Sequence, residues 1–334
     1  MVESGPNTLF LIDTYSIIFR SYYALPPFVN SSGFQTNAVY GVIKSLAKMR
    51  KDFNVKMMCA VYDSIGPTFR KELTETYKAN RAKTPEDLIK QFPVIEEMIE
   101  LFGIPSKRIE GFEADDVIGS ISEQMRGLVD NIVIITGDKD LFQLINSNVS
   151  IYDPRKDMEY DEQGTFDKFG VFPSQMRDYL SLVGDSSDNI PGAPGIGPKT
   201  AVKLLDRYGN LEEIILHKEE LTPGQQKSLK EFSSHRELTE ELVRIRTDLD
   251  ISTQPEEYII GSPQNSALIE KFRELEFHSF ISELDLKTSK TTLTYVQSAV
   301  FRHTEKTAFK IIDGNILLVS SNKEFTVLPL EDAA

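Results

Sequence analysis

The chain has 334 residues, of which 40% are hydrophobic and 26% charged, and these are ordinary values for a globular protein. Its length suits one large domain or two domains with a sizeable core. The single cysteine, Cys59, excludes an intrachain disulfide, which fits a reduced compartment. No apolar stretch approaches the roughly 18 residues of a membrane-spanning helix. With no signal-peptide pattern at the N-terminus, the sequence predicts a cytoplasmic protein without membrane contact.

The net charge of −14 by itself argues against a nucleic-acid partner. Basic residues are nevertheless concentrated in short segments at 70–71, 78–83 and 199–203. Such local clusters are compatible with binding a polyanion if metal ions neutralise the acids. Net charge therefore does not exclude a nucleic-acid partner.

Apolar runs alternate with helical periodicity through the first half of the chain. Strands are predicted at 7–13, 56–63 and 131–136, and helices at 36–53, 93–103 and 111–125. Asn37 is expected to cap its helix, and Gly103 to end the next one. This alternation predicts an α/β fold with a mainly parallel sheet.

After Val149 the chain becomes mainly helical. A strand at 151–154 is followed by helices at 168–185, 201–209, 210–248 and 269–284, with a Gly/Pro-rich hairpin at 191–200. Residues 286–292 form a Ser/Thr/Lys linker. A small β-meander that turns at Asp313-Gly314-Asn315 is expected beyond the linker.

Carboxylates mark the ends of the predicted strands and the turns that follow them. They are Asp13, Asp63, Glu113, Asp115, Asp116, Asp138, Asp140, Asp185 and Asp188. Open α/β sheets bind ligands beyond the carboxyl ends of their strands, so these acids are expected to meet at one edge. So many like charges would repel unless cations neutralised them. Hard divalent ions prefer oxygen ligands and share them with phosphates, so the pattern predicts a multi-metal site for phosphate chemistry.

Each acidic cluster also has a simpler interpretation. The three acids at 113–116 can stabilise the first turn of a helix, although three acids in four residues exceed what capping needs. Asp140 can be the N-cap of a helix after a strand. Asp185 and Asp188 can form Asx turns, and for this pair both interpretations stay open.

Two further segments have the character of a DNA-binding surface. In the hairpin, Gly195-Ile196-Gly197 leaves backbone N–H groups free near Lys199, which suits a phosphate bound without sequence preference. A plain packing corner between two helices is the alternative. Residues 68–88 interleave basic residues with Tyr77, which suits a single strand but equally a solvated helix face.

These motifs together resemble a known family. The chain resembles the 5′ nuclease domain of bacterial DNA polymerase I, because it contains the motifs of that domain in the same order. They are LFLIDTYSIIFRSYYAL, VYD, TFRKEL, YKANR, GFEADDVIG, TGDKDLFQL and LVGDSSDNIPGAPGIGPKTAVKLL. That domain is similar to flap endonucleases, and the resemblance covers about residues 7–284. It implies a PIN/resolvase-like α/β core over 1–170 with a helical arch at about 68–100. A helix-hairpin-helix DNA-binding lobe over 171–285 follows, and 293–334 resembles the truncated start of a proofreading-exonuclease-like domain.

The resemblance also implies a role for individual residues. The first metal site corresponds to Asp13, Asp63, Glu113, Asp115 and Asp116, and the second to Asp138, Asp140, Asp185 and Asp188. Lys78 and Arg81 correspond to catalytic arch residues at the scissile phosphate, and Tyr77 to a stacking aromatic. Further DNA contacts correspond to Arg20, Arg70, Gly195, Gly197, Lys199 and Thr200. Two or more Mg²⁺ or Mn²⁺ ions are implied, with K⁺ at the hairpin.

The sequence therefore predicts a structure-specific 5′→3′ exonuclease and flap endonuclease. Its expected partners are DNA with a 5′ flap or nick and RNA–DNA primer junctions, bound by a monomer associated with the bacterial nucleoid. One alternative is a non-catalytic DNA-binding module, which the full set of acids disfavours. The other is a dehalogenase-type phosphohydrolase, which needs an Asp where this chain has Tyr15. Whether the chain is part of a full polymerase or a standalone nuclease stays open.

Overall fold

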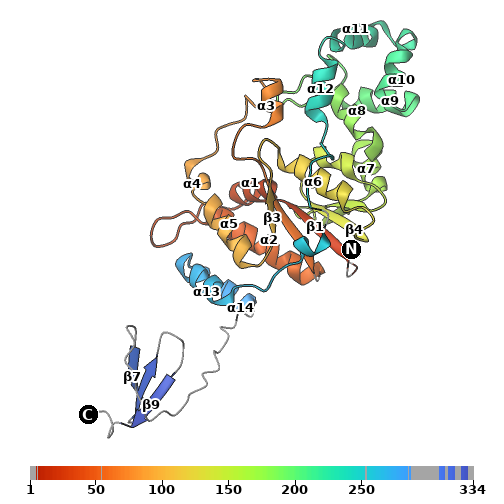
Figure 1. The fold of residues 1–334 in the computed structure, drawn as a ribbon. Helices are drawn as coiled ribbons and strands as arrows, with labels where there is room; N and C mark the ends of the chain where they lie inside the picture. Colours follow the sequence, from red (N-terminus) through yellow and green to blue (C-terminus); the bar gives the residue numbers. More distant parts are fainter. Residues whose placement is uncertain are drawn as a thin grey trace. The chain divides into compact units, whose positions relative to one another are not determined.

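The computed structural model describes residues 5, 7–53, 55–252, 254–284 and 286, and the backbone of 308–312, 315–319 and 325–329. The chain forms two units, Met1–Phe280 and Ile281–Ala334. Figure 1 shows the first unit as a sheet with helices on both faces and further helices α8–α12 gathered at one end.

A six-stranded sheet organises the first unit. Its order is β3-β2-β1-β4-β5-β6, with β6 antiparallel to β5 and the other pairs parallel. The strands are β1 Thr8–Asp13, β2 Met57–Tyr62, β3 Ser106–Arg108, β4 Asn131–Ile135, β5 Val149–Asp153 and β6 Met158–Tyr160. The central strands β1 and β2 are buried throughout because helices cover both faces, which explains their continuous apolar sequence. The mainly parallel α/β sheet that the sequence predicts is confirmed.

Alternate side chains of the central strand pack into two different layers. Leu9 and Leu11 belong to a cluster that includes Val117 of α6. Phe10, on the other face, stacks on Phe53 of α2 with ring centroids 5.7 Å apart. The helices around the sheet are α1 Thr14–Ala24, α2 Asn37–Phe53, α3 Phe69–Leu73, α4 Glu86–Ile89, α5 Phe92–Leu101, α6 Ala114–Gln124, the 3-10 helix η1 Asp140–Leu144, and α7 Glu162–Phe169.

The second half of the first unit is helical. Its helices are α8 Pro173–Val183, α9 Pro198–Tyr208, α10 Leu211–Leu216, η2 Lys218–Glu220, α11 Pro223–Phe232, α12 Arg236–Val243, η3 Pro255–Tyr258, α13 Asn265–Glu274 and the start of α14 His278–Glu283, whose residues after Phe280 belong to the second unit. α8 packs on both η1 and α9, so it joins the sheet to the helices at 198–243.

The expected DNA-binding lobe at 171–285 ends in helices that pack on the sheet half of the first unit. α13 contacts α5, and Phe272 lies beside Phe102 with ring centroids 6.4 Å apart. The ring of Phe277 packs edge-on against the ring of Tyr40 of α2, with centroids 5.4 Å apart. This end of the expected lobe therefore packs on the sheet-covering helices, because its apolar face matches theirs.

The prediction that 210–248 is wholly helical is wrong at its end. α12 ends at Val243, and residues 244–250 form neither helix nor strand. The backbone of this segment bonds side chains from the sheet half: Gln143 donates to Val243 O at 3.0 Å and accepts from Ile245 N at 3.2 Å. Such long-range bonds replace helical ones and leave no mark in the local sequence.

The start of α2 also differs from expectation. Asn37 is the first helical residue and donates to the Tyr22 carbonyl at 2.9 Å instead of capping the helix. The side chain of Gln91, which is fully buried, accepts from Ala38 N and Val39 N at 2.9 and 3.2 Å. A residue about 50 positions away in sequence thus satisfies the free N–H groups of this helix.

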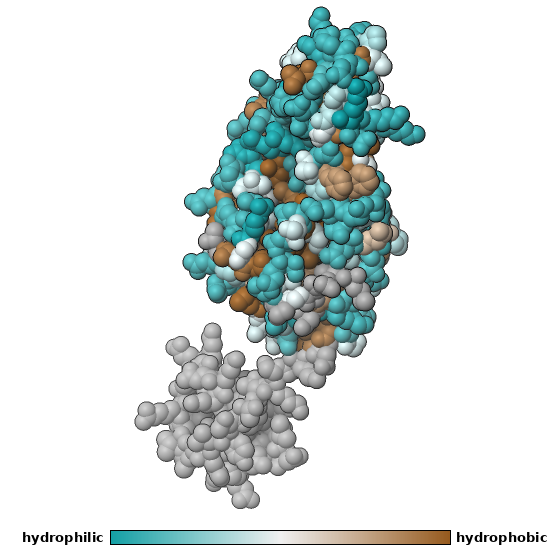
Figure 2. Space-filling model, turned by 90° about the vertical axis from the view of Figure 1, so that its right-hand side faces the viewer, coloured by the Kyte–Doolittle hydropathy of each residue, from teal (hydrophilic) through white to brown (hydrophobic). Residues whose placement is uncertain are grey.

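The second unit contains a three-stranded antiparallel sheet, β7 Ala308–Ile312, β8 Asn315–Val319 and β9 Phe325–Pro329. This confirms the expected meander, while Asp313 and Gly314 of its turn lie outside the described residues. Within the described residues, none of the helices has the length and apolar composition needed to cross a bilayer. The face of the protein in Figure 2 is mainly hydrophilic, with small apolar patches between the polar groups.

Candidate active site

The carboxyl ends of the parallel strands open into one cleft of about 830 Å³. Strand order reverses between β1 and β4, which is where open α/β sheets form their ligand crevice. Eight of the nine predicted carboxylates line this cleft: Asp13, Asp63, Glu113, Asp115, Asp138, Asp140, Asp185 and Asp188. The predicted basic and aromatic residues Arg20, Arg70, Tyr77, Lys78 and Arg81 line it as well. The fold therefore collects residues from 13 to 188 of the sequence at one edge of the sheet.

Two of the acids are fixed where their strands end. Asp13 accepts from Ser16 N at 3.1 Å as the N-cap of α1, and from the hydroxyl of Thr136 at 2.7 Å. Asp63 accepts from Ala114 N at 2.7 Å, at the start of α6. Thr136 is a site residue that sequence reasoning missed, although a polar residue directly after the apolar strand β4 was a signal. These bonds hold the carboxylates in place before any cation binds.

One group of cleft carboxylates, Asp13, Asp115 and Asp140, has no ion pair within 4.0 Å among the described residues. Burial, together with repulsion from Asp138, raises the pKa of Asp13 and that of Asp140 to about 7. The same causes raise the pKa of Asp115 well above its usual range. Asp140 Oδ1 is buried and has no hydrogen-bond partner in the described part of the chain. These acids need a cation that the protein itself does not supply.

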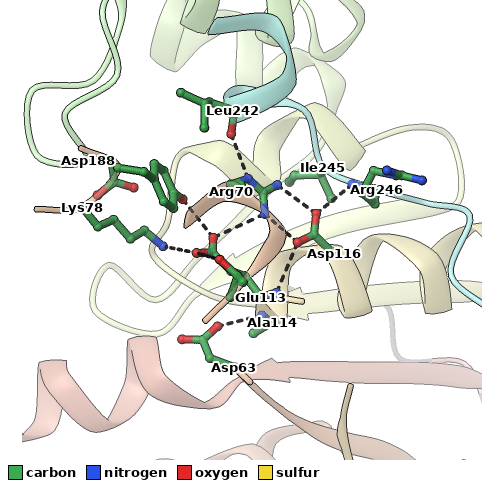
Figure 3. A network of polar contacts seen from close by, with 12 residues as sticks. Asp63, Arg70, Lys78, Glu113, Ala114, Asp116, Asp188, Leu242, Ile245 and Arg246 are labelled. Atoms are coloured by element: carbon green, nitrogen blue, oxygen red, sulfur yellow. Dashed lines mark hydrogen bonds and ion pairs between the residues drawn. The ribbon is translucent and has the colours of Figure 1, made fainter. Parts of the chain in front are cut away.

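A second group of cleft carboxylates is paired with basic residues of the chain. Glu113 lies 3.0 Å from Lys78 Nζ and 3.4 Å from Arg70 Nη1, and Figure 3 shows both approaching its carboxylate. Although burial opposes ionisation, the charges of Lys78 and Arg70 lower the pKa of Glu113. Asp188 accepts from Arg81 Nε at 2.7 Å, but burial still raises its pKa.

Lys139 provides the remaining basic partner, and the sequence analysis overlooked it. Its Nζ lies 2.7 Å from Asp185 Oδ2. Burial opposes the ionised form, but this bond and the Ser187 contacts lower the pKa of Asp185. The signal was available, since Lys139 stands between the two acids of the GDKD motif.

The turn that carries Lys78 and Arg81 is bonded to the acidic loop at 185–190. Lys78 N donates to Asp188 O at 2.9 Å, and Asn189 Nδ2 donates to Thr76 O at 2.9 Å. Lys78 adopts a left-handed backbone conformation, with φ 55°, which is uncommon for a residue other than glycine. The basic residues are thus positioned by tertiary contacts with the acids they face.

Carboxylate oxygens of Asp140, Asp185 and Asp188 lie within 4.8 Å of one another, an arrangement that fits a metal ion. Together with the unpartnered Asp140 oxygen, it shows that the residues present suit a hard divalent cation. The donors are oxygens alone, which favours Mg²⁺ or Mn²⁺ over softer metals.

Asp116 is the predicted ligand that does not reach the cleft. It is fully buried and binds Arg70 through both oxygens, at 2.6 and 2.8 Å. It also accepts from Arg246 N at 2.9 Å and from Glu113 N at 3.3 Å (Figure 3). With all its lone pairs engaged, Asp116 has the geometry of a structural residue, and its expected role as a metal ligand is not supported.

Arg70 and Tyr77 are likewise unavailable to DNA in this conformation. Arg70 is 3% exposed and donates to the carbonyls of Leu242 and Arg244 at 2.9 and 2.7 Å. Tyr77 is 4% exposed, and its hydroxyl donates to Glu113 Oε2 at 2.9 Å. In this structure Arg70 binds chiefly Asp116, and Tyr77 binds Glu113, while their expected contacts with substrate stay a prediction.

The hairpin at 191–200 lies on the surface as the sequence suggests. Gly195 has φ +78°, and a Cβ added at Gly195 or Gly197 would meet nothing within 4 Å. Lys199 is exposed and Thr200 half-buried in the first turn of α9, while Ile196 anchors the hairpin in the core. Ile196 N and Thr200 N bond within the hairpin, to Ala193 O and Gly197 O, while the exposed backbone at Gly195 and Gly197 has no side chain to shield it from an anion.

Family models match most of the first unit. Residues 8–170 match the 5′-3′ exonuclease N-terminal resolvase-like domain, and residues 171–266 match the 5′-3′ exonuclease C-terminal SAM fold. The 5′-3′ exonuclease of Aquifex aeolicus is 39% identical over 279 residues, which cover 84% of this chain and 96% of that protein. DNA polymerase I of Pseudomonas aeruginosa is 37% identical over 284 residues, covering 83% of this chain and 31% of the polymerase.

Solved structures share the fold. The T5 5′-exonuclease with bound zinc has a TM-score of 0.58 at 21% identity, covering 84% of this chain and 99% of that one. The catalytic core of Rad2 in complex with DNA substrate has a TM-score of 0.56 at 20% identity, covering 84% and 92%. This chain spans about a third of the length of the DNA polymerase I relatives, but nearly all of the Aquifex protein. From the identity and coverage of these relatives, the chain belongs to the 5′-3′ exonuclease family.

Proposed function

We propose that this chain is a divalent-metal-dependent 5′ nuclease that hydrolyses phosphodiesters at 5′ ends and 5′ flaps of DNA. The observation that carries the proposal is the cleft in which eight carboxylates face Lys78 and Arg81. Acids that lack a basic partner suit cations, while basic residues at the same site suit a phosphate. A non-catalytic DNA-binding module has no need of this combination.

The metal ions are proposed to be two Mg²⁺ or Mn²⁺. Asp13, Asp63, Glu113 and Asp115 would hold one ion, and Asp138, Asp140, Asp185 and Asp188 the other. When bound, such ions lower the pKa of water and stabilise the charge on the attacking and leaving oxygens.

The residues of the chain itself hold the acids and bind the phosphate. Thr136 and the N-terminus of α1 orient Asp13, so its carboxylate does not need to reorganise on binding. A substrate phosphate competes with Glu113 for Lys78 and with Asp188 for Arg81. Their release frees two carboxylates for cations while the two basic groups take up the negative charge of the phosphate.

The substrate proposal follows from the surface hairpin and the position of the basic turn. Gly195, Gly197, Lys199 and Thr200 are proposed to bind duplex phosphates without sequence preference, with K⁺ at the hairpin carbonyls. Residues 68–100 are proposed as the arch for a 5′ single strand, within a catalytic core at 1–170. Residues 171–285 are proposed as the DNA-binding lobe, 286–292 as a linker and 293–334 as the start of a further domain. A nick, a flap and an RNA primer junction each present a 5′ end beside a duplex, and the protein is proposed to act as a nucleoid-associated monomer.

A 5′-labelled flap oligonucleotide tests the proposal directly. Wild-type protein should release the flap in Mg²⁺ and bind but not cut in Ca²⁺, because Ca²⁺ tolerates looser geometry than octahedral Mg²⁺. The hairpin is tested separately by Lys199→Ala, which should weaken binding of all sequences alike and reduce the salt slope by about one. DNA binding without cleavage under every divalent metal would favour the non-catalytic alternative.

A further inference from the structure

Two arginines and one buried acid lie beside the cleft, on the side of β4 and β5. Asp153 ends β5 and is 1% exposed. Arg155 follows two residues later and lines the cleft together with Arg20 of α1 and Gly137. Arg155 and Asp153 are not among the residues that the family resemblance singles out.

Asp153 fixes the position of Arg155. It accepts from Arg155 N and Nε through Oδ1 at 3.0 and 3.1 Å, and from Arg155 Nη2 through Oδ2 at 2.9 Å. Arg20 Nη1 lies 3.9 Å from the same Oδ1. One carboxylate therefore faces two guanidinium groups, which leaves an excess of one positive charge.

Both guanidinium groups converge over Gly137. A Cβ added there would lie 2.3 Å from Arg20 Nη2 and 2.8 Å from Arg155 Nη2. A larger residue at this position would displace both guanidinium groups from the arrangement seen here. Gly137 directly precedes Asp138, so the pair lies next to the carboxylates of the cleft.

The donors of this pair outnumber their acceptors. In the described part of the chain, Arg20 Nη1 has no hydrogen-bond partner, and Arg20 Nη2 donates to Ser16 Oγ at 3.2 Å. The Arg155 side chain is 51% exposed, and its hydrogen bonds to Asp153 use Nε and Nη2 only. Burial, and then the charge of Arg155, lowers the pKa of Arg20. An anion would relieve this repulsion and accept the remaining N–H groups.

We propose that Arg20 and Arg155, held by Asp153 beside Gly137, form a subsite for a phosphate group of the DNA strand in the cleft. Planar guanidinium groups bind phosphate oxygens through paired N–H donors, which lysine cannot reproduce. The phosphate is a different one from that bound by Lys78 and Arg81, since those residues face Glu113 and Asp188. The subsite rests on the proposed nuclease function and makes Arg155 a substrate-positioning residue.

The test is a set of three variants assayed for DNA binding in Ca²⁺ and for cleavage in Mg²⁺. Arg155→Ala should weaken binding of a flap DNA about tenfold and reduce the slope of log affinity against log salt by about one. It should raise KM with little change in kcat, because the contact is made before and during reaction alike. Arg155→Lys should restore only part of the affinity, and the salt slope should return.

Lys156→Ala is the matched control. It removes one charge from the neighbouring exposed residue, which does not line the cleft, so binding should stay within about twofold of wild type. Thermal unfolding of each variant separates loss of the subsite from loss of the fold. Comparing 5′-phosphate with 5′-hydroxyl substrates identifies the source of the phosphate. If Arg155→Ala weakens binding of both substrates, the subsite binds an internal phosphodiester. If it weakens binding of the 5′-phosphate substrate only, the subsite binds the terminal phosphate.

Equal effects of Arg155→Ala and Lys156→Ala on affinity and salt slope would overturn the subsite. The nuclease proposal would then stand, provided that the wild-type protein still binds and cuts the flap. If wild-type protein neither binds nor cuts, the nuclease proposal itself fails, so the two failures are distinguishable.

Discussion

The carboxylates of the cleft differ in what neutralises them. Glu113, Asp185 and Asp188 have basic partners from the chain itself, whereas Asp13, Asp115 and Asp140 have none among the described residues. Identical chemical groups whose oxygens lie within 4.8 Å of each other thus have opposite pKa directions, lowered for Asp185 and raised for Asp140. The difference arises because the turn at 74–81 and Lys139 reach only one group. The basic partners thus keep Glu113 and Asp185 charged without metal, whereas the ionised form of the unpaired acids is favoured only when a cation binds.

The largest expected effect comes from the unpaired group. Asp140→Asn removes a charge that a divalent cation needs, so flap cleavage should fall by about 10²–10³-fold or more. In metal-free buffer the same variant should unfold at a higher temperature than wild type, because it relieves repulsion between Asp140 and Asp138. Asp167→Asn, on the exposed surface of α7, is the control and should change neither quantity. Near wild-type cleavage by Asp140→Asn would show that the acids without a basic partner do not hold an essential cation.

The next largest effect concerns Asp116, which is paired but buried away from the cleft. Asp116→Ala leaves Arg70 charged and buried without its main partner, which costs about 3–5 kcal/mol of unfolding free energy. Chemical denaturation without metal measures this loss. A true metal ligand would behave in the opposite way, with little loss of stability in metal-free buffer and a large loss of metal affinity. Unchanged stability would therefore contradict the structural role of Asp116 and support its role as a metal ligand.

The stability of the metal-free protein should depend on pH because of the acids that have no basic partner. The pKa of Asp13 and that of Asp140 are raised from 3.8 to about 7 in the folded state. Since the folded protein holds these protons more tightly than the unfolded chain, their contribution to stability is present below about pH 4 and is lost as pH rises to 7. The lowered pKa of Asp185 acts in the opposite sense and only in more acidic solution.

Denaturant unfolding in EDTA between about pH 5 and 8 should accordingly show stability that falls as pH rises. Divalent cations should reverse the trend, because they bind the ionised acids and release protons near pH 7. Calorimetric titration in two buffers of different ionisation enthalpy counts those protons. Cation binding with no proton release at about pH 6.5 would contradict the raised pKa values.

The smallest expected effect separates two roles of Tyr77. Tyr77→Phe keeps the ring and removes the hydroxyl that bonds Glu113, which should cost about 1 kcal/mol of unfolding free energy. DNA affinity should change little, because the ring is buried. If the ring instead stacks on a base, Tyr77→Leu should lower DNA affinity far more than Tyr77→Phe, at equal stability.

Much of the fold follows from local sequence. Buried strands at 8–13 and 57–62 are evident from continuous apolar runs, since a parallel sheet covered on both faces needs them. Acids placed directly after those strands had to meet, because parallel strands end at one edge of the sheet. The cleft and most of its carboxylates were therefore predictable from the amino-acid sequence alone.

The basic partners of the cleft acids were decided only by tertiary structure. Nothing near Asp116 in sequence indicates that Arg70, 46 positions earlier, binds it, or that the backbone N–H of Arg246 completes the contact. The same holds for Gln91, which satisfies the first N–H groups of α2. Side-chain type and spacing determine which groups reach the sheet edge. Which of them are neutralised, buried or left for a cation depends on segments that approach through space, because electrostatic and hydrogen-bond energies depend on distance and burial.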